Sequence, residues 1–172
     1  SLAVESLSKL KGGKSEPVIL KPFGWPRLVL NTKQGLMADL KVRQAAQLAL
    51  NEEDMLYAAF GDKNFYAVDA DLYPKGFPWA TNLGGAVYNK GDAAGAKKLL
   101  DAANPKDRTI RLLTSQQYEF HYKMALVANE YFKAAGFKVD MQVVDWATLV
   151  QRRANPDLWD IFITHSPFLP EP

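Results

Sequence analysis

The residues with the greatest chemical potential are two histidines, His121 and His165, and two serines that close strand-like stretches, Ser115 and Ser166. Neither histidine has a partner at a metal-ligating spacing such as H-E-x-x-H. Neither serine lies in a G-x-S-x-G sequence, the setting of a nucleophile elbow. The chain has no cysteine, which excludes thiol nucleophiles and thiolate metal sites. We therefore predict no catalytic residue and no metal site.

The two histidines are expected to differ in role. His121 lies within a long helical pattern, and we expect it on the surface of that helix. His165 stands at the end of a strand-like stretch, where it could contact a ligand, although a lone histidine more often makes a structural polar contact. Gly84-Gly85 is followed by neither Lys-Ser nor Lys-Thr, so no phosphate-binding loop is predicted.

Length and composition predict one globular domain over residues 1–172. Hydrophobic residues make up 48% and charged residues 23% of the 172 residues, which is typical of a folded domain. The formal net charge of +2 comes without a basic stripe, so no nucleic-acid partner is predicted. No apolar run approaches the roughly 20 residues of a membrane span. The first residues lack the layout of a signal peptide, so any signal would lie outside this chain.

In the first half of the chain, Pro, Gly and helix-capping residues mark the ends of the expected helices and strands. They are a helix over 1–17, strands over 17–21 and 27–31, and helices over 40–50 and 51–60. The turn between the two strands would place Trp25 on a loop. Asp39 is interpreted as a helix N-cap, as are Asp92 and Asp145 further along, so these carboxylates need no catalytic explanation.

Residues 61–92 show no sustained hydrophobic period. A connection of this length is unusual within a compact domain. The stretch is nevertheless rich in aromatic residues, which argues against a solvated linker. We expect some of these side chains to pin the loop to the body and others to line a binding surface. They are Phe65, Tyr66, Tyr73, Phe77, Trp79 and Tyr88.

The second half alternates strands and helices joined by short connections. Strands are expected over 109–114, 137–144 and 158–165, and helices over 92–103, 118–135 and 146–154. This alternation predicts an α/β fold, with a mixed, largely parallel sheet flanked by helices and right-handed crossovers. In such sheets ligands bind beyond the carboxyl ends of the strands.

The last strand is expected to be central, because residues 158–165 present largely apolar side chains to both faces and end in Thr and His. Pro167, Pro170 and Pro172 follow it, and proline cannot continue a helix or donate to a sheet. We therefore expect the chain to leave the sheet as an extended lip that carries Phe168. A domain rarely ends on such an exit, which favours a piece of a longer protein.

The strand ends and the aromatic loops together predict a binding surface with few charges. Aromatic rings accompanied by amides and hydroxyls suit neutral, polar-faced ligands better than phosphates. The candidate contact residues are Trp25, Ser115, Gln117, Trp146, His165, Ser166 and Phe168.

Several motifs, taken in order and with their spacing, resemble the family 5 extracellular solute-binding proteins. They are Leu30-Asn31-Thr32, the stretch from Asp39 to Ala45, Ala96 to Leu100, Ala134 to Val139, Trp159-Asp160 and Glu171-Pro172. This family contains the peptide, nickel, opine and oligosaccharide receptors of ABC importers. The resemblance covers nearly the whole chain.

The resemblance implies that the chain is most of the C-terminal ligand-binding lobe of a two-lobed, type II periplasmic-binding-protein-like fold. It also implies that the protein is not an enzyme, needs no cofactor and acts outside the cytoplasm, in the periplasm or extracellular space. The implied partners are a small solute, the missing N-terminal lobe and a membrane permease.

The resemblance also bears on the ligand. Dipeptide receptors of this family hold the peptide ammonium with an aspartate that aligns with Phe168, and the carboxylate with an arginine that aligns near Ser115. Both charges are missing here, and a buried zwitterion without partners loses several kcal/mol. We therefore expect a less charged ligand, such as a sugar, or a peptide held through its backbone.

A second hypothesis from another class is a small α/β enzyme or a nucleic-acid-binding module. It would require an acid–base pair, a metal cluster or a basic stripe, and the sequence contains no recognisable example. Loss of a measured activity in His165→Ala, with folding intact, would revive it.

Overall fold

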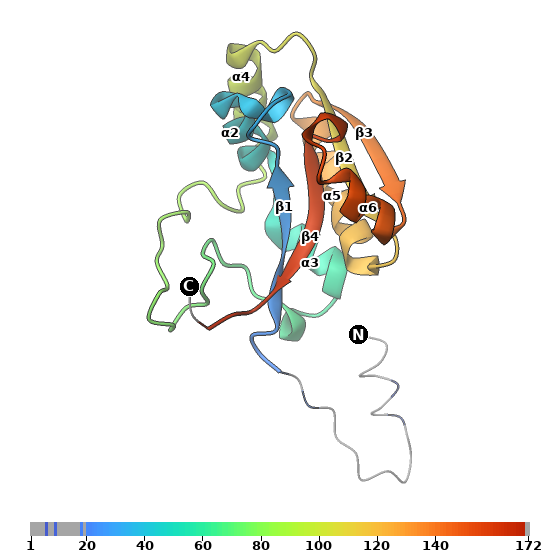
Figure 1. Ribbon diagram of the computed structural model, residues 1–172. Helices are drawn as coiled ribbons and strands as arrows, with labels where there is room; N and C mark the ends of the chain where they lie inside the picture. Colours follow the sequence, from blue (N-terminus) through green and yellow to red (C-terminus); the bar gives the residue numbers. More distant parts are fainter. Residues whose placement is uncertain (1–5, 7–8, 10–17, 19, 171–172) are drawn as a thin grey trace.

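The computed structural model describes Ser6, Lys9, Val18 and residues 20–170. The helix expected over 1–17 lies outside the described residues apart from Ser6 and Lys9. Figure 1 shows an elongated body built around a single sheet, with the chain from residue 61 to 92 forming a long loop beside it.

The sheet has four strands in the order β1-β4-β2-β3. Their bounds are Gly24–Leu30 for β1, Thr109–Ser115 for β2, Lys138–Val144 for β3 and Ile161–Pro167 for β4. Strands β4, β2 and β3 are mutually parallel, whereas β1 pairs with β4 in the antiparallel direction. The predicted mixed, largely parallel sheet is thus confirmed, and β4 is a central strand as expected.

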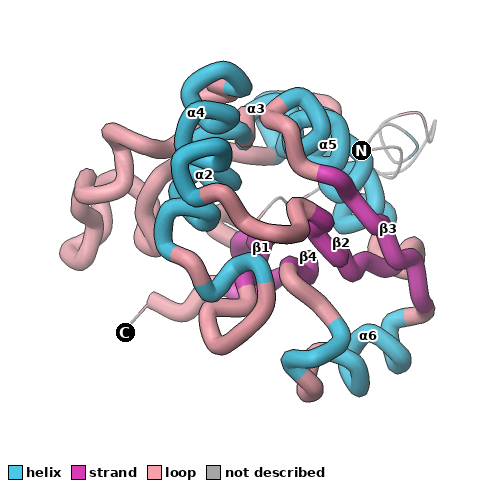
Figure 2. The backbone as a smooth tube through the Cα atoms, turned by 90° about the horizontal axis from the view of Figure 1, so that it is seen from above, coloured by secondary structure: helices cyan, strands magenta, loops and turns pink. Residues whose placement is uncertain are grey.

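Among the described residues, five helices flank the sheet unequally. They are α2 (Leu40–Ala49), α3 (Glu52–Phe60), α4 (Ala93–Ala103), α5 (Glu119–Ala134) and α6 (Trp146–Arg152). Figure 2 shows α2, α3, α4 and α5 on one face and α6 on the other. Short 3-10 helices occupy Leu36–Ala38, Lys63–Phe65 and Pro156–Leu158. In the described part of the chain, no helix combines the length and apolar character that a membrane crossing needs.

The predicted caps define where the helices begin. Asp39 accepts hydrogen bonds from the backbone of Lys41 at 2.7 Å and of Val42 at 3.4 Å. Asp92 and Asp145 accept in the same way at the starts of α4 and α6. The three carboxylates satisfy free N–H groups of the first helical turn. Their interpretation as caps is confirmed.

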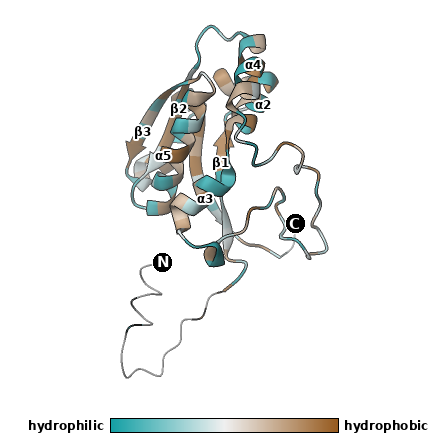
Figure 3. Ribbon diagram, turned by 180° about the vertical axis from the view of Figure 1, so that it is seen from behind, coloured by the Kyte–Doolittle hydropathy of each residue, from teal (hydrophilic) through white to brown (hydrophobic). Residues whose placement is uncertain are grey.

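The core has two parts, one on each face of the sheet. The larger joins β2 and β4 to the four-helix face, with Leu112, Ile161 and Phe132 among its fully buried members. The smaller lies under α6 and contains Leu113, Leu149, Trp159 and Phe162. Successive residues of a strand point to opposite faces, so Ile161 and Phe162 serve different cores. The strands in Figure 3 are accordingly largely hydrophobic in colour.

Two expectations about the strand ends are wrong. Trp25 is in β1 and not on a loop, because Gly24 and Trp25 pair with Pro167 and Ser166. Pro167 is likewise still in the sheet. Phe168 donates its backbone N–H to the Phe23 carbonyl at 3.0 Å, so the nitrogen of Pro167 faces away from β1 and its missing donor removes no bond. Leu20 and Lys21, expected in a strand, form none.

Candidate ligand-binding site

The carboxyl ends of the parallel strands lie at one end of the sheet, where the predicted contact residues follow. Ser115 ends β2, opposite Val144 at the end of β3. Trp146 begins α6 directly after β3, and His165 lies near the end of β4. This is the position at which an open α/β sheet binds its ligands.

Five rings pack together here, and we call them the histidine group: Tyr118, Phe120, His121, Trp146 and His165. The Nδ1 atom of His165 lies 3.1 Å from Nε2 of His121, within hydrogen-bond distance. The Tyr118 ring has its centroid 4.9 Å from that of His165 and 4.9 Å from that of Trp146. His165 is half-buried, so the group presents part of its surface to solvent.

His121 is buried in this group, and the expectation that it lies on a helix surface is wrong. Its exposed fraction is 0%. It falls on the same side of α5 as Ala125, Ala128 and Phe132, which are also fully buried. The spacing of these residues follows the 3.6-residue period, so the sequence contained a signal that His121 faces the core.

Burial changes the acid–base behaviour of His121. Loss of solvation is the main cause that lowers its pKa to about 4, and the neighbouring His165 adds to the effect. A buried imidazole resists protonation because its cation loses hydration. His121 is therefore neutral at neutral pH, and its hydrogen bond to His165 joins an uncharged ring to its neighbour.

Ser115 and Gln117 connect the strand end to α6. Ser115 is fully buried, and its Oγ accepts the backbone N–H of Gln117 at 3.3 Å. The Gln117 side chain in turn accepts the backbone N–H of Trp146 through Oε1 at 2.6 Å. Ser115 therefore shapes the turn, and Gln117 satisfies a free donor of the first turn of α6.

A second set of rings surrounds the chain after β4, and we call it the Phe168 group: Trp25, Tyr73, Phe77 and Phe168. The Phe168 ring centroid lies 5.0 Å from that of Phe77, 6.1 Å from that of Trp25 and 6.5 Å from that of Tyr73. Tyr73 and Phe77 come from the long loop, so part of that loop is pinned to the sheet as expected. The Trp25 indole N–H is buried without a partner among the described residues.

The structure thus divides the predicted contact residues into two neighbouring sets joined by β4. Ser115, Gln117, Trp146 and His165 meet in or beside the histidine group, and Trp25, Ser166 and Phe168 meet in or beside the Phe168 group. Sequence reasoning missed Tyr118, Phe120 and His121, which contribute three of the five rings of the histidine group.

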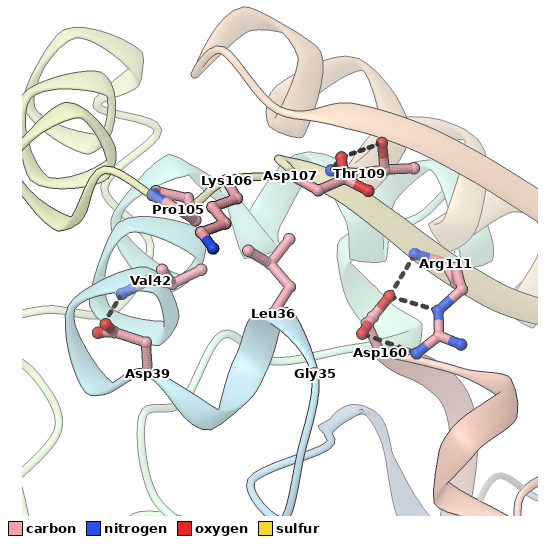
Figure 4. Close-up of a pocket in the computed structure, with 10 residues that line it drawn as sticks. All are labelled: Gly35, Leu36, Asp39, Val42, Pro105, Lys106, Asp107, Thr109, Arg111 and Asp160. Atoms are coloured by element: carbon pink, nitrogen blue, oxygen red, sulfur yellow. Dashed lines mark hydrogen bonds and ion pairs between the residues drawn. The ribbon is translucent and has the colours of Figure 1, made fainter.

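A cavity of about 410 Å³ lies at the opposite end of the sheet, where β2 begins. Figure 4 shows that Asp160 pairs with Arg111, that Asp107 pairs with Thr109, and that Asp39 accepts the backbone N–H of Val42. These groups are engaged within the fold, and the cavity is remote from the histidine group.

The described part of the chain contains no cluster of three or more potential metal-ligating side chains.

The sheet order and the flanking helices are those of part of a periplasmic-binding-protein fold. The family model "Bacterial extracellular solute-binding proteins, family 5 Middle" matches residues 2–168. The chain belongs to this family, which confirms the resemblance seen in the sequence. The family description does not favour the enzyme or nucleic-acid hypothesis.

Individual relatives agree with this assignment. The oligopeptide-binding protein AppA of Bacillus subtilis (strain 168) is 28% identical over 152 residues, which is 80% of this chain and 26% of the relative. The solved structure of AgaA from A. tumefaciens R10 in complex with agropinic acid is 25% identical, with a TM-score of 0.69 over 84% of this chain and 29% of AgaA.

The murein tripeptide binding protein MppA of Escherichia coli has a TM-score of 0.70 at 24% identity, with 84% of this chain and 29% of MppA covered. At this identity the likeness is one of fold. The chain spans about a quarter of the length of the curated relative and somewhat more of the solved ones.

Proposed function

We propose that this chain is most of the C-terminal ligand-binding lobe of a solute receptor that serves an ABC importer. Family membership supports a solute-binding role, and the short coverage of each relative supports a part of a larger receptor. The proposed partners are the remaining lobe of the same protein and a membrane permease. The proposed place of action is the periplasm or the extracellular space.

The ligand would contact the histidine group and the Phe168 group. The observation that carries this proposal is the meeting of Trp146, His165 and Gln117 at the carboxyl ends of the parallel strands, where this class of sheet binds ligands. Rings with a few amide and imidazole groups around them favour a ligand with apolar faces and polar edges.

The same positions argue against a dipeptide held by its charged ends. Phe168, at the position where dipeptide receptors of the family have an aspartate, packs against three aromatic rings. Ser115, near the position of their arginine, is buried and bonded to Gln117. Without those charges a buried zwitterion would lose several kcal/mol. A peptide held through its backbone or a sugar fits better.

The names of two relatives are consistent with this range of ligands. AppA of Bacillus subtilis is an oligopeptide-binding protein, and AgaA was solved with agropinic acid. Peptides longer than two residues and sugar- or opine-like solutes are therefore the first classes to test.

Titration calorimetry of the full-length protein with dipeptides, pentapeptides and oligosaccharides tests the proposal. We expect binding of a pentapeptide or an oligosaccharide, and at least a tenfold loss of affinity in Trp146→Leu. Leu126→Ala is the matched control, because Leu126 is an exposed apolar residue of α5 outside both groups. Nanomolar binding of dipeptides would contradict the proposed ligand class, and equal losses in both variants would contradict the proposed site.

A further inference from the structure

The contact between the two histidines restricts where their protons lie. His165 Nδ1 and His121 Nε2 are 3.1 Å apart, so one of these nitrogens carries a hydrogen and donates it to the other. A neutral imidazole has a single N–H. The choice of donor therefore decides which nitrogen of each ring is protonated.

With both rings neutral, two arrangements satisfy the contact. In the first, His165 donates from Nδ1 and His121 must then carry its only hydrogen on Nδ1. In the second, His121 donates from Nε2, its own Nδ1 is bare, and His165 carries its hydrogen on Nε2. The two arrangements differ at Nε2 of His165, the ring nitrogen that is not in the contact. This atom is a hydrogen-bond acceptor in the first arrangement and a donor in the second.

The burial of His121 separates the two arrangements. Its Nδ1 atom is sealed from solvent and has no hydrogen-bond partner among the described residues. The first arrangement would leave a buried N–H donor unsatisfied at this atom, whereas the second leaves only a lone pair. Buried N–H groups without a partner are the rarer defect in folded proteins.

We infer that His121 fixes His165 in the tautomer that carries its hydrogen on Nε2, so that His165 donates a hydrogen bond to an oxygen atom of the ligand. This inference deepens the proposed function and rests on it for the ligand. His165 is half-buried. Its Nε2 atom is not among the buried side-chain polar atoms that lack a hydrogen-bond partner in the described part of the chain. His121 is thus a positioning residue, and His165 is the residue that selects the ligand atom.

The consequence is a preference for a carbonyl or carboxylate oxygen at this point of the ligand. A fixed N–H donor pairs with such an oxygen and leaves an N–H or ammonium group of the ligand unpaired, which costs affinity. Among the ligand classes proposed above, a peptide held through its backbone carbonyls meets this requirement directly.

Long-range proton–nitrogen NMR of the full-length protein, labelled with ¹⁵N-histidine, tests the tautomers at pH 7.5. Protonated and bare imidazole nitrogens are distinguished by their ¹⁵N chemical shifts, and the variants His121→Gln and His165→Gln assign the signals. We expect both rings to be protonated on Nε2. A hydrogen on Nδ1 of His165 would overturn the inference.

Two substitutions of His121 separate its tautomer role from its packing role. His121→Gln retains an N–H donor near the position of Nε2, so His165 should keep a single tautomer. His121→Met fills a similar volume without a donor, so His165 should show a mixture of both tautomers. An unchanged single tautomer in His121→Met would overturn the role of His121, and thermal unfolding of each variant verifies that it is folded.

A ligand arm uses penta-alanine as the probe. We expect the signal of the His165 Nε2 hydrogen to shift on saturation and to exchange more slowly with water. Binding of penta-alanine without any change at His165 would overturn the donor role. Failure of penta-alanine to bind would count against the proposed peptide ligand, whereas the tautomers measured without ligand would still decide the role of His121.

Discussion

The Asp160 carboxylate is held by the main chain and the side chain of one residue, Arg111. Its Oδ2 atom accepts the backbone N–H and the Nε–H of Arg111, each at 2.9 Å, and its Oδ1 atom accepts Nη2–H at 3.1 Å. Asp160 is 2% exposed. It also donates its backbone N–H to the Arg111 carbonyl at 3.0 Å. This connection joins the beginning of β4 to β2 at the end of the sheet opposite the histidine group.

Removal of Arg111 should therefore destabilise the fold more than neutralisation of Asp160. Arg111→Met leaves a buried carboxylate without its cation, at a cost of about 1–3 kcal/mol. Asp160→Asn leaves a guanidinium that is one-third exposed and can be hydrated. Urea unfolding measures both, and the double variant should resemble Asp160→Asn alone. Lys97→Met, which breaks an exposed pair with Asp101, is the control and should change little. Equal effects of Arg111→Met and Lys97→Met would contradict the buried-pair assignment.

Gly35 should not tolerate alanine, because two constraints coincide there. Its φ of +73° favours glycine, and a Cβ atom would lie 2.8 Å from Oδ1 of Asp160. Gly35→Ala should cost about 2–4 kcal/mol, from backbone strain and the disturbed carboxylate together. Gly76→Ala separates the two causes, because Gly76 has a φ of +98° but open space around its Cβ position. The midpoint of thermal unfolding should fall more for Gly35→Ala, and equal shifts would exclude a contribution from Asp160.

The elements that the sequence predicted well are those defined by local chemistry. The capping side chains of Asp39, Asp92 and Asp145 act within a few residues of their own position. The motifs shared with the family could also be recognised in the sequence. The structure explains two of them, the one that contains Asn31 and the Trp159-Asp160 pair. Asn31 donates to the carbonyls of Pro156 at 2.8 Å and Trp159 at 3.1 Å, so Asn31 and the Trp159-Asp160 pair form one structural connection.

The features that sequence reasoning missed depend on contacts between distant segments. Trp25 belongs to a strand only because Ser166, far along the chain, pairs with it. The burial of His121 follows the helical period of α5, but its contact with His165 arises only because β4 lies against that helix. Proline cannot donate to a sheet, yet Pro167 remains paired because its nitrogen faces away from β1. Local propensity does not contain these facts, since tertiary pairing decides them.

Glu52 should destabilise the fold when it is ionised. Its side chain is buried, one oxygen accepts a hydrogen bond from Gln47 Nε2 at 2.6 Å, and the other has no partner among the described residues. Loss of solvation is the main cause that raises the pKa of Glu52. The folded state then binds more protons than the unfolded state. The contribution of Glu52 to the free energy of unfolding therefore falls as the pH rises above about 4.3, the ordinary pKa of a glutamate side chain.

Glu52→Gln should therefore raise the free energy of unfolding at pH 7.5, and the gain should vanish near pH 4. Chemical denaturation at the two pH values measures the difference. Glu53→Gln is the matched control, because it is the neighbouring acidic residue in the same first turn of α3 but forms an exposed pair with Lys63. A gain for Glu53→Gln, or a gain for Glu52→Gln that persists at pH 4, would show that burial of the Glu52 charge is not the cause.

His121 should make the fold weaker in acid. Because burial lowers its pKa to about 4, the folded state binds fewer protons than the unfolded state between pH 4 and the ordinary value of about 6.5. The free energy of unfolding should therefore fall as the pH decreases through this interval, by about 2–3 kcal/mol in total. His121→Met lacks the titrating group, so its unfolding free energy should lose that part of the pH dependence. The control Leu126→Ala, on the same helix, should retain the slope of the unaltered protein, and parallel profiles for His121→Met and the unaltered protein would rule out His121 as the source.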